Sequence, residues 1–371
     1  HLERSHLFLV PLDSERRWYR YHHLFQEFLQ RVGAERDPEW LRSIHFRTAG
    51  LWEARGELDE AVHHFVEAGH PADAARLLSG SVQDLLAQGR FETLRHWLAE
   101  IPENLWPAAP RLFIIQANCE VAAGEDRAAL RWLETAWRHL RASGDLDGEA
   151  ETLRILGHLC IWEGARERLR ALAQDVAPRL ETFPPAARAR VLELLARAAE
   201  VEGDLPGAER TYRDALATAQ ASGVPHADIT PRRYLASLLG MMGRFTEAEG
   251  LFDEVIAGYR RIGGTHEEAH VRVHLALLLS SLGRYDEADQ HLAAVAAAQP
   301  VVPCRVLHGN LLIARGIVAA RRLLARPAED LLREALEPGR PSYRYLIDRL
   351  PAQIELSLLL ASREPNEARR L

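Results

Sequence analysis

The chain has 371 residues and a formal net charge of -7, with 47% hydrophobic and 27% charged residues. This composition predicts a folded chain, and no apolar run is as long as the roughly 18 uncharged residues that a membrane-spanning helix needs. The net negative charge and the absence of a cluster of basic residues argue against binding to a nucleic-acid backbone, so we expect no direct nucleic-acid contact by this region. We also expect no membrane contact.

The first predicted elements lie within residues 2–31. A short apolar run at residues 7–10, a polar turn and a strand-like run at residues 18–21 predict a small β-hairpin. An amphipathic helix follows from His22, with its apolar side chains on one side. This order indicates the C-terminal part of a winged-helix-like module, to which we assign residues 1–32.

Two adjacent histidines stand at the start of that helix. His22 and His23 could be metal ligands, a catalytic pair or packing residues. No further ligand or nucleophile pattern completes them. We therefore expect them to fix the junction between hairpin and helix, with one imidazole buried and hydrogen-bonded and the other more exposed.

A repeated pattern runs through the rest of the chain. A glycine is followed two positions later by a residue that is usually apolar, and five positions later by an alanine in the clearest copies. These copies begin at Gly56, Gly203, Gly243 and Gly283, and weaker ones begin at Gly89, Gly124 and Gly164. From Gly124 onward the glycines recur every 39 or 40 residues, which indicates a repeat architecture.

Each copy combines the signals of two consecutive helices. The glycine suits the left-handed end of one helix, and acidic residues such as Asp286 and Glu287 suit the first turn of the next. The alanine allows the paired helices to approach closely, and a bulky residue such as Phe252 follows on the same face. A single pair cannot bury its apolar faces, so the pairs must stack. We assign residues 33–371 to this all-α domain.

The pattern resembles the tetratricopeptide repeat. That family places Gly, an aromatic residue, Ala, an aromatic residue, Ala and Pro in this order. The best copy here consists of Gly283, Tyr285, Ala288, Leu292, Val295 and Pro300. The period near 40 residues exceeds the family's period of about 34, so we expect longer helices or loops. The resemblance implies a superhelix of antiparallel helix pairs whose first helices line a concave groove.

The two ends of the chain suggest that it belongs to a longer protein. The first residue is His1, and the last repeat stops about one turn into its second helix, at residues 366–371. Cys119, Cys160 and Cys304 lie far apart and form no Cys-x-x-Cys pair, which favours reduced thiols and a cytoplasmic location.

Motifs of common enzyme classes are missing from the sequence. There is no P-loop, no Rossmann glycine motif and no G-x-S-x-G elbow. We therefore expect no catalytic residue and no bound cofactor in this region.

One metal-binding motif has two interpretations. His266, Glu267 and His270 satisfy H-E-x-x-H, and His274 follows on the same helical face. Imidazoles four residues apart on a helix can share a zinc ion, with the glutamate as general base of a hydrolase. Alternatively, His266 and Glu267 lie in a solvated first helical turn and the match is accidental. We favour the second interpretation, predict no metal ligand, and keep the zinc hydrolase as a remote alternative.

The predicted concave groove supplies the candidate ligand-binding residues. Counting back 13, 10, 6 and 3 positions from the repeat glycines gives the side chains that should face it. The candidates are Asn118, Arg154, His158, Arg190, Glu193, Arg197, Arg233, Ser237 and His270. Arginine forks among carboxylate and imidazole groups suit a polar ligand or an acidic peptide, but a solvated charged face would look the same.

The N-terminal quarter resembles a segment of the large MalT-type transcription activators, which belong to the STAND class of signalling ATPases. In that family an apolar run ending in Leu-Asp, and then Trp-Tyr-Arg-Tyr-His-x-Leu-Phe, follow the nucleotide-binding domain; residues 7–25 match this order. The next family motif matches at Trp52, Gly56, Glu60, Ala61, Val62 and His64. The specific resemblance spans residues 2–80, and repeat architecture alone carries it further.

This resemblance implies a regulatory switch. An upstream domain would bind ATP or ADP, and a small-molecule inducer or regulatory protein bound by the superhelix would favour an ATP-bound, self-associating form that activates transcription. A maltooligosaccharide is one possible inducer. A LuxR-type helix-turn-helix would usually follow. The open alternative is a tetratricopeptide adaptor that binds a protein partner only.

Overall fold

The computed structural model of the chain forms two compact units. The first comprises His1–Gly80 with Ala99–Leu105, and the second comprises Ser81–Leu98 with Trp106–Leu371. The contacts therefore divide the chain near residue 80. The assignment of residues 1–32 and 33–371 to separate domains stays a prediction. The described residues are 9–11, 19–21, 23–80, 86, 89–298, 304–337, 346–361 and 363–370.

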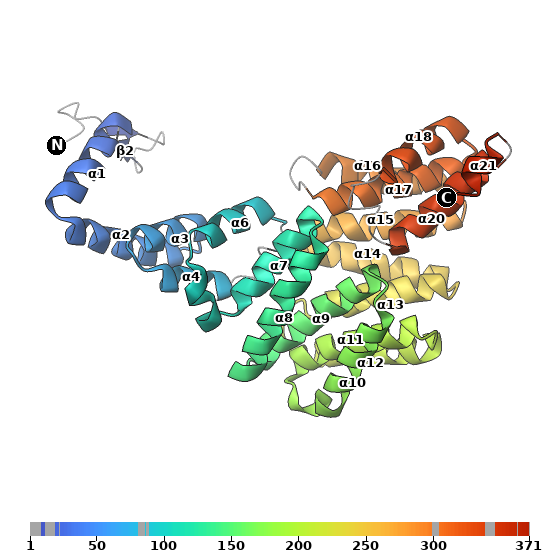
Figure 1. The fold of residues 1–371 in the computed structure, drawn as a ribbon, viewed down its shortest axis with the longest axis horizontal. Helices are drawn as coiled ribbons and strands as arrows, with labels where there is room; N and C mark the ends of the chain where they lie inside the picture. The colour runs from blue at the N-terminus through green and yellow to red at the C-terminus, as the bar shows by residue number, and fades with distance from the viewer. Residues whose placement is uncertain are drawn as a thin grey trace. The chain divides into compact units, whose positions relative to one another are not determined.

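The first unit contains the expected hairpin and helix, followed by further helices (Figure 1). In chain order its elements are β1 (Leu9–Pro11), β2 (Tyr19–Tyr21), α1 (His23–Arg36), α2 (Pro38–Glu53), α3 (Leu58–Glu67) and α4 (Pro71–Gly80). The strands pair antiparallel, with Leu9 opposite Tyr21. His22 and the side chain of His23 lie outside the described part, so the role expected for this histidine pair stays a prediction.

The second unit is a stack of helix pairs, as the repeats predicted. It opens with α6 (Phe91–Ala99) and the 3₁₀ helix η2 (Glu103–Ala108). The pairs are α7 (Arg111–Ala123) with α8 (Asp126–Ser143), α9 (Leu146–Trp162) with α10 (Arg166–Val176), α11 (Pro185–Val201) with α12 (Leu205–Ala221), α13 (Ile229–Met241) with α14 (Phe245–Arg261), α15 (Thr265–Ser281) with α16 (Tyr285–Ala298), α17 (Arg305–Arg321) with α18 (Ala325–Ala335), and α20 (Leu346–Leu360) with α21 (Pro365–Ala368).

The repeat residues build the contacts within and between these pairs. The alanines Ala208, Ala248 and Ala288 are fully buried, and Tyr212 and Phe252 bury their rings four residues later on the same helices. The first helices also contact one another from α9 through α11, α13, α15 and α17. These first helices therefore form an inner layer, as the tetratricopeptide resemblance implied.

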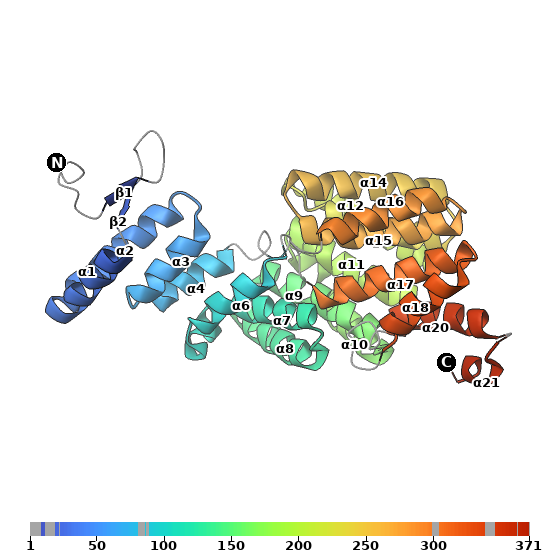
Figure 2. The same ribbon diagram turned by 90° about the horizontal axis from the view of Figure 1, so that it is seen from above.

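The stack bends until distant pairs meet. Helix α17 contacts α7, and α20 contacts α9, although these helices belong to repeats far apart in the sequence (Figure 2). At this contact the Cys304 thiol lies 3.9 Å from the carbonyl oxygen of Ala122. The inner layer consequently curves around the groove, and α17 meets α7 across it.

The turn between α17 and α18 lacks the repeat glycine. Gly283 has φ +74° in its turn, and Leu323 occupies the same place forty residues later with φ +63°. Both turns are closed alike: the amide nitrogens of Gly283 and Leu323 lie 3.2 and 2.9 Å from the carbonyl oxygens of Ser280 and Ala320. The Leu323 side chain is 88% exposed, so packing does not offset the strain of a left-handed leucine.

We expect Leu323→Gly to raise the free energy of unfolding by about 1 kcal/mol, because glycine adopts this conformation without a Cβ clash. Gly283→Leu should lower it by a similar amount. No atom lies within 4 Å of a Cβ built at Gly283, so that loss would come from the backbone alone. Urea-induced unfolding of the two variants measures both effects. A destabilised Leu323→Gly variant would contradict this account of the turn.

Candidate ligand-binding groove

The inner layer of the second unit encloses a cavity of about 400 Å³. Helices α7, α9, α11, α13 and α15 contribute its walls, together with the segment before α13. Seven of the nine predicted groove residues line it: Asn118, Arg154, His158, Arg190, Glu193, Arg233 and His270. The periodicity of the sequence thus placed these side chains on a common face before their neighbours were known.

The other two predicted residues lie behind the cavity wall. Arg197 is buried, with its guanidinium 4.5 Å from the centre of the Tyr234 ring. The hydroxyl of Ser237 donates to the backbone carbonyl of Arg233 at 3.2 Å. Both side chains support the wall, and neither is among the residues that line the cavity.

Each lining arginine contacts a carboxylate. Arg154 lies 2.6 Å from Glu151, and Arg190 lies 2.6 Å from Asp147 and 3.3 Å from Glu151. The first pair lies within α9, and the two Arg190 pairs link α11 to α9. Because the guanidinium groups are already oriented by carboxylates, their remaining N–H donors are held in fixed positions at the cavity surface.

A second ion pair links α13 to α15. The Arg233 guanidinium lies 2.9 Å from a Glu267 carboxylate oxygen and donates to the Tyr234 hydroxyl at 3.0 Å. Burial acts to raise the pKa of Glu267, but Arg233 together with His266, His270 and Arg154 outweighs it, and the pKa falls to about 2. Glu267 is therefore an anion at neutral pH and a weak base.

The expectation that His266 and Glu267 occupy a solvated first turn is wrong. His266 is only 6% exposed, and its ring packs edge-on against Phe91 with centroids 5.0 Å apart. Glu267 lines the cavity and is held by Arg233. The first turn of α15 is covered because the stack closes on itself, which no local sequence pattern indicates.

Glu193 is the least compensated charge in the groove. Its side chain is buried, and its Oε2 atom has no hydrogen-bond partner among the described residues. Burial raises the pKa of Glu193 to about 7, against the attraction of Arg154 and Arg190. This carboxyl is consequently poised to exchange a proton near neutral pH or to donate to a bound group.

The buried histidines of the groove are neutral at pH 7. Burial lowers the pKa of His270 to about 3, with His266 and Arg233 adding to the effect. The His158 Nε2 atom lies 2.6 Å from the Tyr234 hydroxyl, and burial lowers the pKa of His158 as well. A neutral imidazole both donates and accepts, so the groove offers both kinds of partner beside its charged pairs.

Several lining residues escaped the sequence analysis. Phe91, at the start of α6, and Cys304, immediately before α17, enter the cavity wall, and the closure of the stack brings them there. His226 lies in the loop before α13 with φ +64°, an unusual value for a residue other than glycine. No spacing signal marked these positions.

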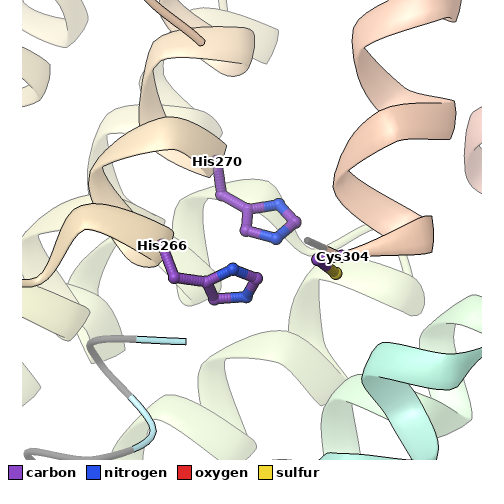
Figure 3. Close-up of side chains that lie close together, drawn as sticks. All are labelled: His266, His270 and Cys304. Atoms are coloured by element: carbon purple, nitrogen blue, oxygen red, sulfur yellow. The ribbon is translucent and has the colours of Figure 1, made fainter. Parts of the chain in front are cut away.

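The H-E-x-x-H motif has a third potential ligand in space. One ligand atom from each of His266, His270 and Cys304 lies within 4.8 Å of the others (Figure 3). Such a group can hold a transition-metal ion, but the glutamate of the motif is held by Arg233 instead of standing free as a base. The geometry therefore disfavours the zinc-hydrolase alternative.

Within the described part of the chain, no helix combines the length and apolar character needed to cross a membrane.

Comparison with known proteins identifies both parts of the chain. Residues 1–41 match the family MalT winged helix domain, and residues 229–300 match the tetratricopeptide repeat family. The HTH-type transcriptional regulator MalT of Cronobacter sakazakii is 32% identical over 186 residues, which cover 49% of this chain and 20% of that protein. The chain is similar to MalT-type regulators. The expected family resemblance is thereby confirmed.

Another MalT sequence and a protein kinase also match about half of the chain. MalT of Vibrio campbellii is 26% identical over 176 residues, covering 47% of this chain and 18% of that regulator. The serine/threonine-protein kinase PknK of Mycobacterium tuberculosis is 27% identical over 190 residues, covering 49% and 17%. The chain thus spans about a fifth of the length of these relatives.

Solved structures with a similar fold include a sensor protein of the STAND class. The STAND protein PH0952 of Pyrococcus horikoshii, which has a tetratricopeptide repeat sensor, superposes with a TM-score of 0.55 at 13% identity over 95% of this chain and 55% of that chain. A Rap protein complexed with competence and sporulation factor gives a TM-score of 0.53 at 14% identity, over 89% of this chain and all of the other. These likenesses establish the fold of the MalT-like chain.

Proposed function

We propose that the second unit is the signal-sensing part of a MalT-like transcriptional regulator and that it binds a small polar inducer inside its superhelical groove. The observation that carries this proposal is the cavity of about 400 Å³, whose walls combine oriented arginines, carboxylates and neutral imidazoles. Concave sites of this size, with a few placed polar groups among apolar ones, are typical of small-molecule binding.

The closure of the stack favours a small ligand over a protein partner. Helix α17 contacts α7 across the groove, so the inner face is surrounded by the chain's own helices. A folded partner would have to separate these helices before it reached Arg190 or Glu193. A sugar, a nucleotide fragment or a short peptide would not. The Rap protein, with its similar fold, is complexed with a competence and sporulation factor, which supports ligand binding by such superhelices.

Ligand binding would act on the whole stack. The cavity is lined by consecutive inner helices, and each pair contacts its neighbours. A ligand that bridges α9 and α15 would favour one curvature of the stack over others, because it binds the two arrangements with different affinity. In the full-length protein, this change would promote ATP-dependent self-association and transcription, with the nucleotide bound outside this chain.

Cavity filling provides the test. Purified chain would be heated with a panel of maltooligosaccharides, short peptides and nucleotides, and we expect at least one compound to raise the melting temperature by several degrees at saturation. Ala186 lines the cavity, so Ala186→Trp should abolish that shift, whereas Ala221→Trp at an exposed position of α12 should keep it.

A second pair of variants tests the polar contacts. Arg190→Gln should weaken the shift, and Arg210→Gln, which changes an exposed arginine on α12, should leave it unaltered. If no compound shifts the melting temperature, or if the filled cavity responds as strongly as the wild-type chain, the proposal of an interior inducer site is wrong.

A further inference from the structure

Three side chains with metal-binding atoms converge on one side of the groove. His266 and His270 lie one turn apart on α15, and Cys304 immediately precedes α17. Figure 3 shows the two imidazoles directed toward the side where the Cys304 sulfur lies. One nitrogen of each ring and the sulfur fall within 4.8 Å of one another. Cys304 comes from a different repeat, so the sequence motif supplied only two of the three ligands.

An unpaired buried atom points to a missing ligand at this place. The Nδ1 atom of His266 is shielded from solvent and has no hydrogen-bond partner among the residues that the structure describes. The whole residue is 6% exposed. Leaving a buried polar atom without a partner is costly, and such atoms in folded proteins usually have one. The Cys304 thiol lies 3.9 Å from the Ala122 carbonyl oxygen, a long contact for a hydrogen bond.

The donor set selects the class of ion. Two imidazole nitrogens and a thiolate suit Zn²⁺ and similar borderline-soft ions, and not Mg²⁺ or Ca²⁺, which prefer oxygen. Around a tetrahedral zinc ion the ligand atoms would lie about 3.5 Å apart, so small side-chain rotations bring the three atoms into place. All three residues line the cavity, which leaves the fourth position for water or a groove ligand.

We propose that His266, His270 and Cys304 form a binding site for one Zn²⁺-class transition-metal ion in the wall of the groove. On binding, the Cys304 thiol releases its proton to solvent as the sulfur–metal bond forms, and two imidazole nitrogens donate their lone pairs. No oxidation or reduction takes place. The prediction of no metal ligand rested on a solvated first turn of α15, which the burial of His266 contradicts.

The position of the site gives it a structural consequence. Cys304 lies at the contact between α17 and α7, whereas the histidines belong to α15. An ion that joins them ties the closing contact of the stack to the inner layer, so the metal stabilises the closed arrangement. Its role is not hydrolytic, since Glu267 is paired with Arg233. The site stands independently of the proposed inducer, because the metal ion itself is the probe.

Cobalt substitution tests the site. The whole chain, freed of metal with a chelator, would be titrated with Co²⁺ and then Zn²⁺. We expect one Co²⁺ per chain, with an absorption band in the near ultraviolet from thiolate-to-cobalt charge transfer, displaced by one equivalent of Zn²⁺. Cys304→Ala should remove the band and weaken binding by about 100-fold or more, because a direct ligand is lost. Cys160→Ala, at another buried thiol, should behave as wild type.

A second substitution and a stability measurement exclude a folding artefact. His270→Gln should also weaken Co²⁺ binding by about 100-fold while it keeps the helical circular dichroism of the wild-type chain. Zn²⁺ should raise the melting temperature of the wild type and of Cys160→Ala, but not of the two ligand variants. Absence of the charge-transfer band in the wild type, or its persistence in folded Cys304→Ala, would overturn the proposal.

Discussion

Replacing Arg233 with methionine is expected to lower the free energy of unfolding by about 2 to 3 kcal/mol, because it leaves a carboxylate in the groove wall without its counter-ion. Arg233 is 16% and Glu267 31% exposed at the side chain, and their charged atoms lie 2.9 Å apart. The substitution also removes the donor of the Tyr234 hydroxyl. Methionine keeps most of the side-chain volume, so the effect reports the charge. Urea-induced unfolding at pH 7 measures it.

A double variant separates the charge from the packing. Arg233→Met combined with Glu267→Gln removes both charges and should recover most of the lost stability. The pKa of Glu267 is about 2 in the folded chain and 4.5 as its ordinary value, so the pair contributes stability above pH 4.5 that is lost as the pH falls toward 2. The deficit of the single variant should accordingly shrink in acid. A double variant no more stable than Arg233→Met would refute this account.

Glu193→Gln is expected to stabilise the chain by about 2 to 3 kcal/mol at pH 8 and by almost nothing at pH 4.5. Burial raises the pKa of Glu193 from 4.5 to about 7 in the folded chain. A raised pKa means that the protonated carboxyl contributes stability fully below pH 4.5, and that this contribution is lost as the pH rises through 7. Glutamine resembles the protonated carboxyl at every pH, so the difference in free energy of unfolding between Glu193→Gln and the wild type grows as the pH rises from 4.5 through 7.

The comparison of two pH values checks this prediction. Free energies of unfolding at pH 5 and pH 8 would be measured for the wild type, Glu193→Gln and Glu163→Gln, the last at an exposed carboxylate near the end of α9. We expect the advantage of Glu193→Gln to be several-fold larger at pH 8 than at pH 5. An equal gain in stability at both pH values would show that the pKa of Glu193 is not raised in the folded chain, and a loss of stability at pH 8 would show that its carboxylate is ionised and well paired; either result would contradict this account.

The sequence was sufficient for the fold because its repeat signals are local. Gly283 ends one helix, Ala288 packs at the crossing and Leu292 fills the space beyond it, all within ten residues. The same counting placed Arg190 and Arg233 on the inner face, since a helix of regular pitch fixes which side chains share a side. That these residues bind a ligand stays a prediction.

Local sequence patterns could not predict the contact between distant repeats that closes the stack. The contact between Cys304 and Ala122 joins residues 182 positions apart, and its existence depends on the accumulated curvature of several pairs. The burial of His266 and the third ligand of the proposed metal site both follow from this contact. Leu323 was missed for a different reason: the backbone takes the repeat conformation there without the residue that signals it.

Hydrogen–deuterium exchange with a stabilising compound tests the central claim most directly. Amide exchange of the chain would be compared with and without the compound that raises its melting temperature. An inducer bound in the groove should slow exchange in α9, α11, α13 and α15, the helices that line the cavity, and Ala186→Trp should abolish this protection. Protection confined to the outer helices α12 and α16, or to the first unit, would contradict an interior binding site.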